Sequence, residues 1–268
     1  MRHLPPQHPQ FYVTAPQDCP YLENKVERKL FTALYGSNSS RLNNSLSKQG
    51  FRRSQNVLYR PSCSNCTACM SARIPSKDFS PSKSQKRILS KNEDLVRTIN
   101  PPLATDPQFE LFKNYINKRH SNGGMSDMDS DDFTSMIEET NVESKIIEYY
   151  IKRNSKLELI SFSLVDILDD GISMVYSVFD PELSDRSLGT YMILDHSNLA
   201  LEMNLEFVYL GYWVKGSSKM DYKRRFSPLE VFTNDKWTCA SKSKVTKIES
   251  DKHDQQKHGV PIYLPSEE

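Results

Sequence analysis

The chain has no apolar stretch approaching the roughly 18 residues that would span a bilayer, and its first twenty residues contain no hydrophobic signal segment. It also has no internal repeat of the kind that builds solenoids. Hydrophobic residues make up only 37% of the 268 positions, which is low but within the globular range. These absences predict a soluble, unexported protein, and we expect it in the cytoplasm.

Cysteine is scarce and unevenly placed. Three of the five cysteines fall in one short segment, Cys63-x-x-Cys66-x-x-Cys69, and Cys19 precedes it. The odd number of cysteines and the crowding of three of them favour metal binding in a reducing compartment over a disulfide framework. The four thiols are therefore candidate ligands of Zn²⁺ or an iron–sulfur cluster, the alternative being thiols that only pack a tight turn. Cys239 lies apart and is expected in the core.

Neither sign of charge dominates the whole chain, but the charges are unevenly distributed. The net charge of +1 combines +10 on residues 1–100, −12 on residues 101–210 and +3 on residues 211–268. A basic segment joined to an acidic one is expected if one surface meets a polyanion and another does not. The alternative is solvated surface charge without a partner.

The pattern of breakers and periodic segments predicts two domains between polar tails. Asn100-Pro101-Pro102 reads as the linker. The expected divisions are a tail, a basic cysteine-containing domain, a second domain and a polar tail, at 1–10, 11–100, 101–240 and 241–268.

Hydrophobic periodicity predicts helices and strands that together define an α+β fold. Helices are expected at 39–49, 84–92, 107–118, 130–139 and 188–204. Strands are expected at 51–59, 145–150, 156–167, 172–179 and 207–214. The last predicted helix follows three strands and a loop and precedes a final strand. This order predicts that the helix packs on the sheet formed by those strands.

Arginines gather beside the cysteine segment. Arg52, Arg53 and Arg60 have Gln, Asn and Tyr residues between them. Guanidinium groups bind phosphate through paired hydrogen bonds, and aromatic rings stack on unpaired bases, so this run could hold the single-stranded end of an RNA. A basic solvated face is the alternative.

A second candidate site is Arg186-Ser187-Leu188-Gly189-Thr190-Tyr191, between a strand and a helix. Backbone N–H groups at such a helix start form a cradle for an anion or oxyanion. Acetyltransferases of the GNAT superfamily hold pyrophosphate there, but Tyr191 stands where they have a small residue and would crowd coenzyme A.

His120 and His196 are further candidates for a general base.

Read together, several segments resemble the arginyl-tRNA–protein transferase family, and within it the bacterial leucyltransferase branch. The matches run from about Phe11 to Trp237. They include Cys19-Pro20-Tyr21-Leu22, Gly50-Phe51-Arg52-Arg53-Ser54-Gln55-Asn56, Tyr59-Arg60-Pro61, Pro81-Ser82-Lys83-Ser84-Gln85, Gly123-Gly124-Met125, Ser187-Leu188-Gly189-Thr190-Tyr191 and Tyr209-Leu210-Gly211-Tyr212-Trp213.

The resemblance implies a small cysteine-bearing N-terminal domain followed by a GNAT-like acyltransferase domain. It also implies transfer of leucine from leucyl-tRNA to an N-terminal Asp or Glu of acceptor proteins, which creates an N-degron. No cofactor is required, because the aminoacyl ester is already activated, and neither membrane nor DNA is an expected partner. Arginyl transfer from arginyl-tRNA, an acetyl-CoA-dependent acetyltransferase and a non-catalytic RNA-binding protein remain alternatives.

Residue roles follow from this chemistry as expectations. Ser187, Gly189 and Tyr191 are the catalytic candidates, and Arg52, Arg53, Arg60 and Arg186 are the tRNA-binding candidates. An acidic acceptor needs a cation beside its carboxylate. The candidates for that role are Arg53, Arg119, Lys219 and Lys223.

Overall fold

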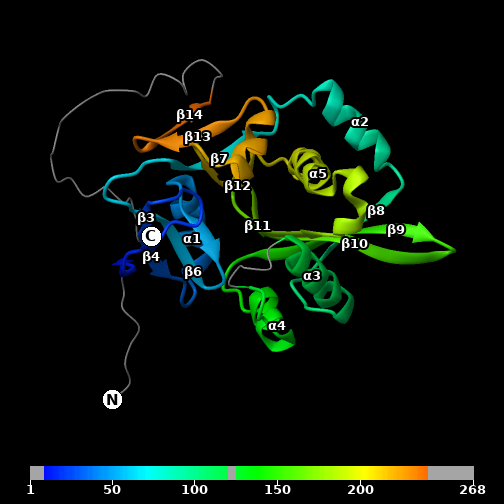
Figure 1. Cartoon of the computed structure of the whole chain (residues 1–268), viewed down its shortest axis with the longest axis horizontal. Coiled ribbons are helices and arrows are strands. Elements are labelled where there is room, and N and C mark those ends of the chain that lie inside the picture. The colour runs from blue at the N-terminus through cyan, green and yellow to red at the C-terminus, as the bar shows by residue number, and fades with distance from the viewer. Residues whose placement is uncertain (1–8, 120–124, 241–268) are drawn as a thin grey trace. The chain divides into compact units, whose positions relative to one another are not determined.

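The structure is a computed structural model, and it describes residues 9–119 and 125–240. Helices and strands are mixed along the chain (Figure 1). Two compact units are present: residues 1–74 with 210–268 form the first unit, and residues 75–209 form the second. None of the described helices is both long and apolar enough to cross a membrane.

The division into units differs from the predicted boundary near residue 100. The structure assigns residues 75–100 to the second unit. The reason is strand pairing, since β8 (Leu95–Asn100) pairs along its whole length with β9 (Ser144–Arg153). The chain then returns to the first unit within β12 (Phe207–Val214), so that unit is built from two separate stretches of sequence.

The first unit contains a four-stranded antiparallel sheet in the order β1-β4-β6-β5. Its strands are β1 (Tyr12–Val13), β4 (Lys29–Ala33), β5 (Arg52–Ser54) and β6 (Val57–Pro61). A short ribbon of β2 (Gln17–Asp18) and β3 (Val26–Glu27) leads into β4.

The predicted helix at 39–49 is confirmed as α1 (Ser39–Lys48). It ends at Lys48, and Gly50 has the expected place just after the helix, where its φ of +80° suits a left-handed residue. The single strand predicted at 51–59 is wrong. The chain reverses at Gln55, with φ +49°, so β5 and β6 form a hairpin in which Arg52 pairs with Tyr59.

The remainder of the first unit is a set of strands in the order β14-β13-β7-β12. They are β7 (Cys69–Pro75), β13 (Glu230–Thr233), β14 (Lys236–Cys239) and the end of β12. A 3₁₀ helix, η2 (Ser218–Arg225), follows β12. Sequence patterns predict neither β7, which begins within the cysteine segment and lacks strict alternation, nor the β13–β14 hairpin, whose strands have four residues each and carry polar side chains.

The second unit has a sheet in the order β8-β9-β10-β11-β12. The predicted strands are confirmed as β9, β10 (Lys156–Ile167), β11 (Gly171–Phe179) and β12. All pairs are antiparallel except β11 with β12, which are parallel. The parallel crossover runs through η1 (Pro181–Arg186) and α5 (Leu188–Glu202).

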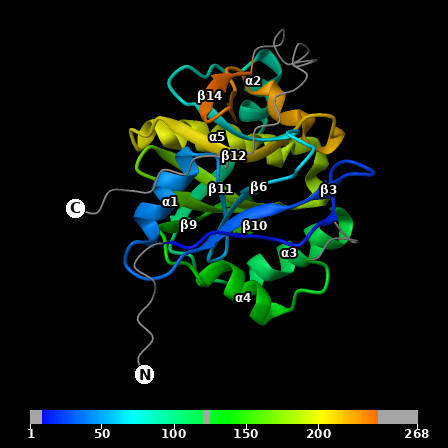
Figure 2. The ribbon, with the colours of Figure 1, turned by 90° about the vertical axis from the view of Figure 1, so that its left-hand side faces the viewer.

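Helices cover both faces of this sheet. The predicted helices are confirmed as α2 (Lys83–Lys91), α3 (Asp106–Arg119), α4 (Ser130–Glu138) and α5. A reciprocal capping box between Ser82 and Gln85 fixes the start of α2. Figure 2 shows α5 on one face of the sheet and α3 with α4 on the other.

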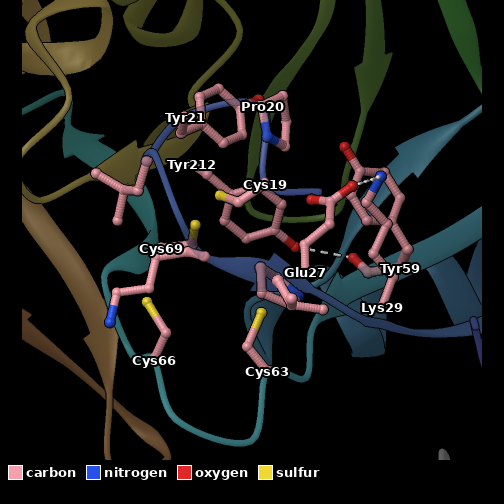
Figure 3. A pocket seen from close by; sticks show the side chains of 14 residues that line it. Cys19, Pro20, Tyr21, Glu27, Lys29, Tyr59, Cys63, Cys66, Cys69 and Tyr212 are labelled. Atoms are coloured by element: carbon pink, nitrogen blue, oxygen red, sulfur yellow. Dashed lines mark hydrogen bonds and ion pairs between the residues drawn. The ribbon is translucent and has the colours of Figure 1, made fainter. Parts of the chain in front are cut away.

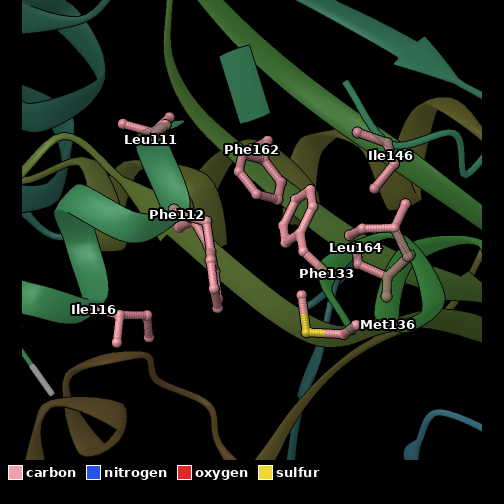
Figure 4. Packing of buried hydrophobic residues seen from close by; sticks show 10 residues of the cluster. Leu111, Phe112, Ile116, Phe133, Met136, Ile146, Phe162 and Leu164 are labelled. Atoms are coloured by element: carbon pink, nitrogen blue, oxygen red, sulfur yellow. The ribbon is translucent and has the colours of Figure 1, made fainter. Parts of the chain in front are cut away.

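Side-chain alternation along β10 assigns residues to these two faces. Phe162 and Leu164 join the buried cluster under α3 and α4, where Phe112 and Phe133 lie 5.1 Å apart between ring centroids (Figure 4). Ser163, between them in sequence, donates a hydrogen bond to the Met192 sulfur of α5. The start of α5 is thereby fixed on the face opposite the larger aromatic core.

Candidate functional site

One pocket of the first unit is lined by thiols, charged side chains and tyrosine rings (Figure 3). Its walls come from the segment before β4, from β6 and from the loop after it, together with Tyr212 of β12. The lining residues are Cys19, Pro20, Tyr21, Leu22, Lys25, Val26, Glu27, Lys29, Tyr59, Pro61, Cys63, Cys66, Cys69 and Tyr212. The four cysteines singled out by spacing thus share one cavity.

The thiols are free and half-buried. Cys63 donates a weak hydrogen bond to the backbone oxygen of Arg28, 3.8 Å away. Burial, reinforced by the neighbouring thiols, raises the pKa of Cys69 to about 12. Across residues 9–119 and 125–240, no group of three or more His, Cys, Asp or Glu side chains is placed to hold a metal ion. The described residues thus give no support to metal binding at Cys19, Cys63, Cys66 and Cys69, which stays a prediction.

Cys239 corrects another expectation. It was expected in the core, but it is exposed at the end of β14. The strand ends there, so its last side chain lacks a covering layer.

The polar side chains of the pocket were not identified from sequence. Glu27 ends β3 and Lys29 begins β4, and their Oε1 and Nζ atoms lie 3.0 Å apart. The Glu27 side chain is 16% exposed and the Lys29 side chain 39%. Residues at positions i and i+2 lie on the same side of an extended chain, so the spacing of Glu27 and Lys29 was the sequence pattern that could have predicted this ion pair.

Two tyrosines form a hydrogen-bonded wall of the same pocket. The Tyr212 hydroxyl donates to the backbone oxygens of Tyr59, at 2.8 Å, and Gly50, at 3.2 Å. Its ring lies 5.9 Å from the Tyr59 ring. Burial raises the pKa of Tyr212 well above its usual value, so the hydroxyl stays protonated and donates.

The predicted tRNA-binding arginines of the β5–β6 hairpin are largely buried. Arg53 donates to the Gln55 backbone oxygen at 2.8 Å, and Arg60 lies over the Phe51 ring at 4.8 Å. Burial lowers the pKa of Arg60. Arg52 lies against Gly211, where an added Cβ would come within 3.2 Å of its guanidinium group. Their role in tRNA binding stays a prediction.

A buried lysine supports β12 beside Arg52. Lys223 of η2 donates to the backbone oxygens of Leu210, at 2.8 Å, and Tyr212, at 2.7 Å. Both carbonyls can face one donor because Gly211 between them has φ +80°, a conformation that favours glycine. Burial, with the charge of Arg52 as the second cause, lowers the pKa of Lys223 to about 7.

The predicted cradle of the second unit lies at the start of α5. Ser187 has φ +53° and stands at the N-cap position, although its side chain makes no capping hydrogen bond. Gly189 faces the Phe179 ring, which a Cβ would approach to 3.2 Å. Tyr191 is buried, edge-on to Tyr149 at 5.5 Å, and burial raises its pKa to about 12. The structure thus places Tyr191 within the unit's packing, and the catalytic roles of Ser187, Gly189 and Tyr191 stay predictions.

The remaining predicted cations are distributed over both units. Arg186 forms a two-bond ion pair with Asp94, at 2.8 and 2.9 Å, which ties the end of η1 to the segment between α2 and β8. Arg119, at the end of α3, lies over the Phe179 ring at 5.5 Å. Lys219 is exposed in η2. None of these three, nor Lys223, lines the pocket of the first unit.

Of the two candidate histidines, the structure describes one. His120 lies outside the described residues. His196 is fully buried in α5, where its Nδ1 contacts the Met192 backbone oxygen, and burial lowers its pKa. A network that sequence did not reveal lies beside it and runs from the core to the surface: Tyr149 donates to Asp195 at 2.7 Å, and Arg97 bridges Asp195 and the exposed Glu202.

Comparison with known proteins defines the class. The family model described as "Arginine-tRNA-protein transferase, N terminus" matches residues 17–87, and the one described as "Arginine-tRNA-protein transferase, C terminus" matches residues 107–233. The chain therefore belongs to the arginine-tRNA-protein transferase family, whose members transfer an amino acid from aminoacyl-tRNA to a protein N-terminus.

Close relatives narrow this class. The aspartate/glutamate leucyltransferase of Ruegeria pomeroyi is 59% identical over 88% of this chain and 86% of its own length. Those of Cereibacter sphaeroides and Paracoccus denitrificans are 56% and 54% identical, each over 88% of this chain, and cover 85% and 88% of their own lengths. Among solved structures, L-PGS from Bacillus licheniformis aligns over 54% of this chain and 45% of its own, with 11% identity and a TM-score of 0.40.

Proposed function

We propose that this chain transfers leucine from leucyl-tRNA to the N-terminal Asp or Glu of acceptor proteins. Family membership supports the class of reaction, and the names of relatives at 54–59% identity support the donor and acceptors. The leucine added would then act as an N-degron that marks the acceptor for proteolysis. Because charged tRNA is made in the cytoplasm, we place the reaction there.

The distribution of charge between the units is the structural observation that carries this proposal. Residues 1–74 and 210–268 contain 21 Lys and Arg against 11 Asp and Glu, whereas residues 75–209 contain 14 against 23. The first unit therefore has a net charge of +10 and the second one of −9. A polyanionic tRNA is attracted to the first unit and repelled by the second.

The order of elements in the second unit supports a GNAT-like acyltransferase fold. Three antiparallel strands, β9, β10 and β11, precede α5, which leads into β12 parallel to β11. The N–H groups of Ser187, Thr190 and Tyr191 already donate to backbone oxygens, so the donors that this turn offers to an anion are those of Leu188 and Gly189, in the first turn of α5. In the proposed reaction these donors serve the oxyanion of the tetrahedral intermediate.

The reaction balances without an added cofactor. The neutral α-amine of the acceptor attacks the leucyl carbonyl carbon, a C–N bond forms, and the ester bond to the tRNA ribose breaks. One proton passes from the attacking nitrogen to the departing ribose oxygen. With a pKa of about 7.7 to 8.0, roughly a tenth of N-terminal amines are already neutral near pH 7, so positioning dominates over base strength.

The test measures transfer of labelled leucine from leucyl-tRNA to an Asp-initiated peptide. Three further reactions separate the alternatives: arginyl-tRNA as donor, acetyl-CoA as donor, and leucyl-tRNA treated with ribonuclease. We expect label in the peptide only with intact leucyl-tRNA. If only arginyl-tRNA serves as donor, the transferred residue is arginine and not leucine. Acetyl transfer that ribonuclease does not affect, or tRNA binding without turnover, would reject the proposal.

A further inference from the structure

The pocket of the first unit carries a charge pattern that fits one end of a polypeptide. Glu27 and Lys29 form an ion pair inside it, and Lys25 adds a second lysine to its lining. Figure 3 shows Glu27 and Lys29 beside Tyr59, with the thiols of Cys63, Cys66 and Cys69 on another side of the cavity. The other walls are aromatic or apolar, so the ion pair is the pocket's main polar feature.

A ligand of one charge only would be poorly matched to this pair. An acidic side chain by itself would draw Lys29 away and leave the Glu27 carboxylate, 16% exposed, without its cation. Leaving a largely buried charge unpaired is costly. A ligand that carries an ammonium group and a carboxylate a few bonds apart replaces both partners at once, so neither charge is left unpaired.

An N-terminal Asp or Glu is such a ligand, since its α-ammonium group lies two or three carbons from its side-chain carboxylate. Internal Asp and Glu residues lack the ammonium group, and N-terminal Asn lacks the carboxylate. We propose that this pocket binds the N-terminal residue of the acceptor, with Lys29 contacting its side-chain carboxylate and Glu27 its α-ammonium group, which loses one proton to water before the nitrogen attacks the leucyl ester. The assignment rests on the proposed leucyl transfer and names the acceptor subsite for it.

Two single variants separate the two contacts. Lys29→Gln removes the partner of the carboxylate, so the kcat/KM ratio of Asp- over Asn-initiated peptides should fall about tenfold, through KM. Glu27→Gln removes the partner of the ammonium group, which both peptides carry, so KM should rise for both while their ratio is kept. Lys48→Gln, an exposed lysine of α1, is the matched control and should change neither quantity.

Readouts of tRNA affinity and melting temperature accompany each variant. Affinity for tRNA should stay at the parent's value. The melting temperature should fall slightly in Lys29→Gln, which leaves Glu27 unpaired, but a loss of stability lowers kcat/KM for both peptides alike and leaves their ratio unchanged. If a single variant is unstable, the exchange Glu27→Lys with Lys29→Glu keeps an ion pair and should still abolish the preference for Asp. A parental Asp-to-Asn ratio in Lys29→Gln or in the exchanged variant would overturn the inference.

Binding can also be located without turnover. Iodoacetamide labelling of Cys63 and Cys66 should slow at least several-fold with a saturating Asp-initiated peptide but not with its N-acetylated form. Labelling of Cys239, which does not line the pocket, should be unchanged. Equal labelling with both peptides would overturn the inference. Absence of leucyl transfer by the parent to any peptide would instead reject the proposed function, and the labelling result would stand separately.

Discussion

The Nζ atom of Lys223 lies 2.7 Å from the backbone oxygen of Tyr212, and the same amine also donates to Leu210. A neutral amine has two N–H donors, which this pair of carbonyls satisfies, so the contact does not depend on the positive charge. The lysine thereby holds the chain on both sides of Gly211 and sets the direction in which Tyr212 enters the pocket.

Replacing this lysine should remove a pH dependence of stability. The folded pKa of Lys223 is about 7 and the unfolded value about 10.4, so between these values the unfolded chain binds more protons. The free energy of unfolding should therefore rise with pH in this window, by up to about 1.4 kcal/mol per unit from this group. Urea unfolding at pH 7 to 8.5 of the parent and Lys223→Met should show a stability difference that grows with pH. A constant difference would contradict the assignment.

The Tyr212 hydroxyl should contribute measurably to the stability of the first unit. Tyr212→Phe removes the donor shared by the backbone oxygens of Gly50 and Tyr59, at a cost of about 1–3 kcal/mol for unsatisfied buried groups. Thermal or urea unfolding measures the loss. Tyr35→Phe is the matched control, because that side chain is 75% exposed and its change should be within error. Equal stability of the two variants would refute the role of the Tyr212 hydroxyl.

Attraction of tRNA to the first unit predicts unequal effects of surface lysines. Lys215 and Lys236 are exposed in the first unit, and Lys152 and Lys156 are exposed in the second. Changing the first pair to Gln should weaken tRNA binding and lower the slope of log K against log salt by about 0.7 for each lost phosphate contact. The same change in the second pair should leave the slope unaltered. Equal slopes for both double variants would contradict the proposal that tRNA binds to the basic first unit.

Thiol reactivity should follow burial. The pKa of Cys69 is raised to about 12, so very little thiolate forms at pH 7.5, whereas Cys239 is exposed. Alkylation followed by mass spectrometry should label Cys239 first and Cys69 last. Stoichiometric zinc or iron in anaerobically purified protein would support the predicted metal site, and a chelator should then speed labelling. Labelling of Cys69 at the rate of Cys239 would contradict its burial.

Much of the second unit follows from local sequence. Phe162 and Leu164 alternate with Ser163 along one strand, and alternation of that kind assigns a strand and its buried face without tertiary information. The helices were also predicted from local sequence, although α2 begins at Lys83, one residue before the predicted start. The first unit was less predictable, because its strands are short and the turn at Gln55 has no glycine to announce it.

The sequence by itself determined the class of protein, since motifs spread from Phe11 to Trp237 keep their order, and its spacing marked Cys63, Cys66 and Cys69 as one group. That Cys19 joins them was decided by the tertiary structure. Only the tertiary structure decided what surrounds those cysteines. Glu27, Lys29 and Tyr59 come from neighbouring strands, and Tyr212 comes from a strand more than 150 residues further along the chain. Periodicity and spacing act over a few residues, whereas a pocket is made by pairing between distant strands, and no local pattern records which strands will pair.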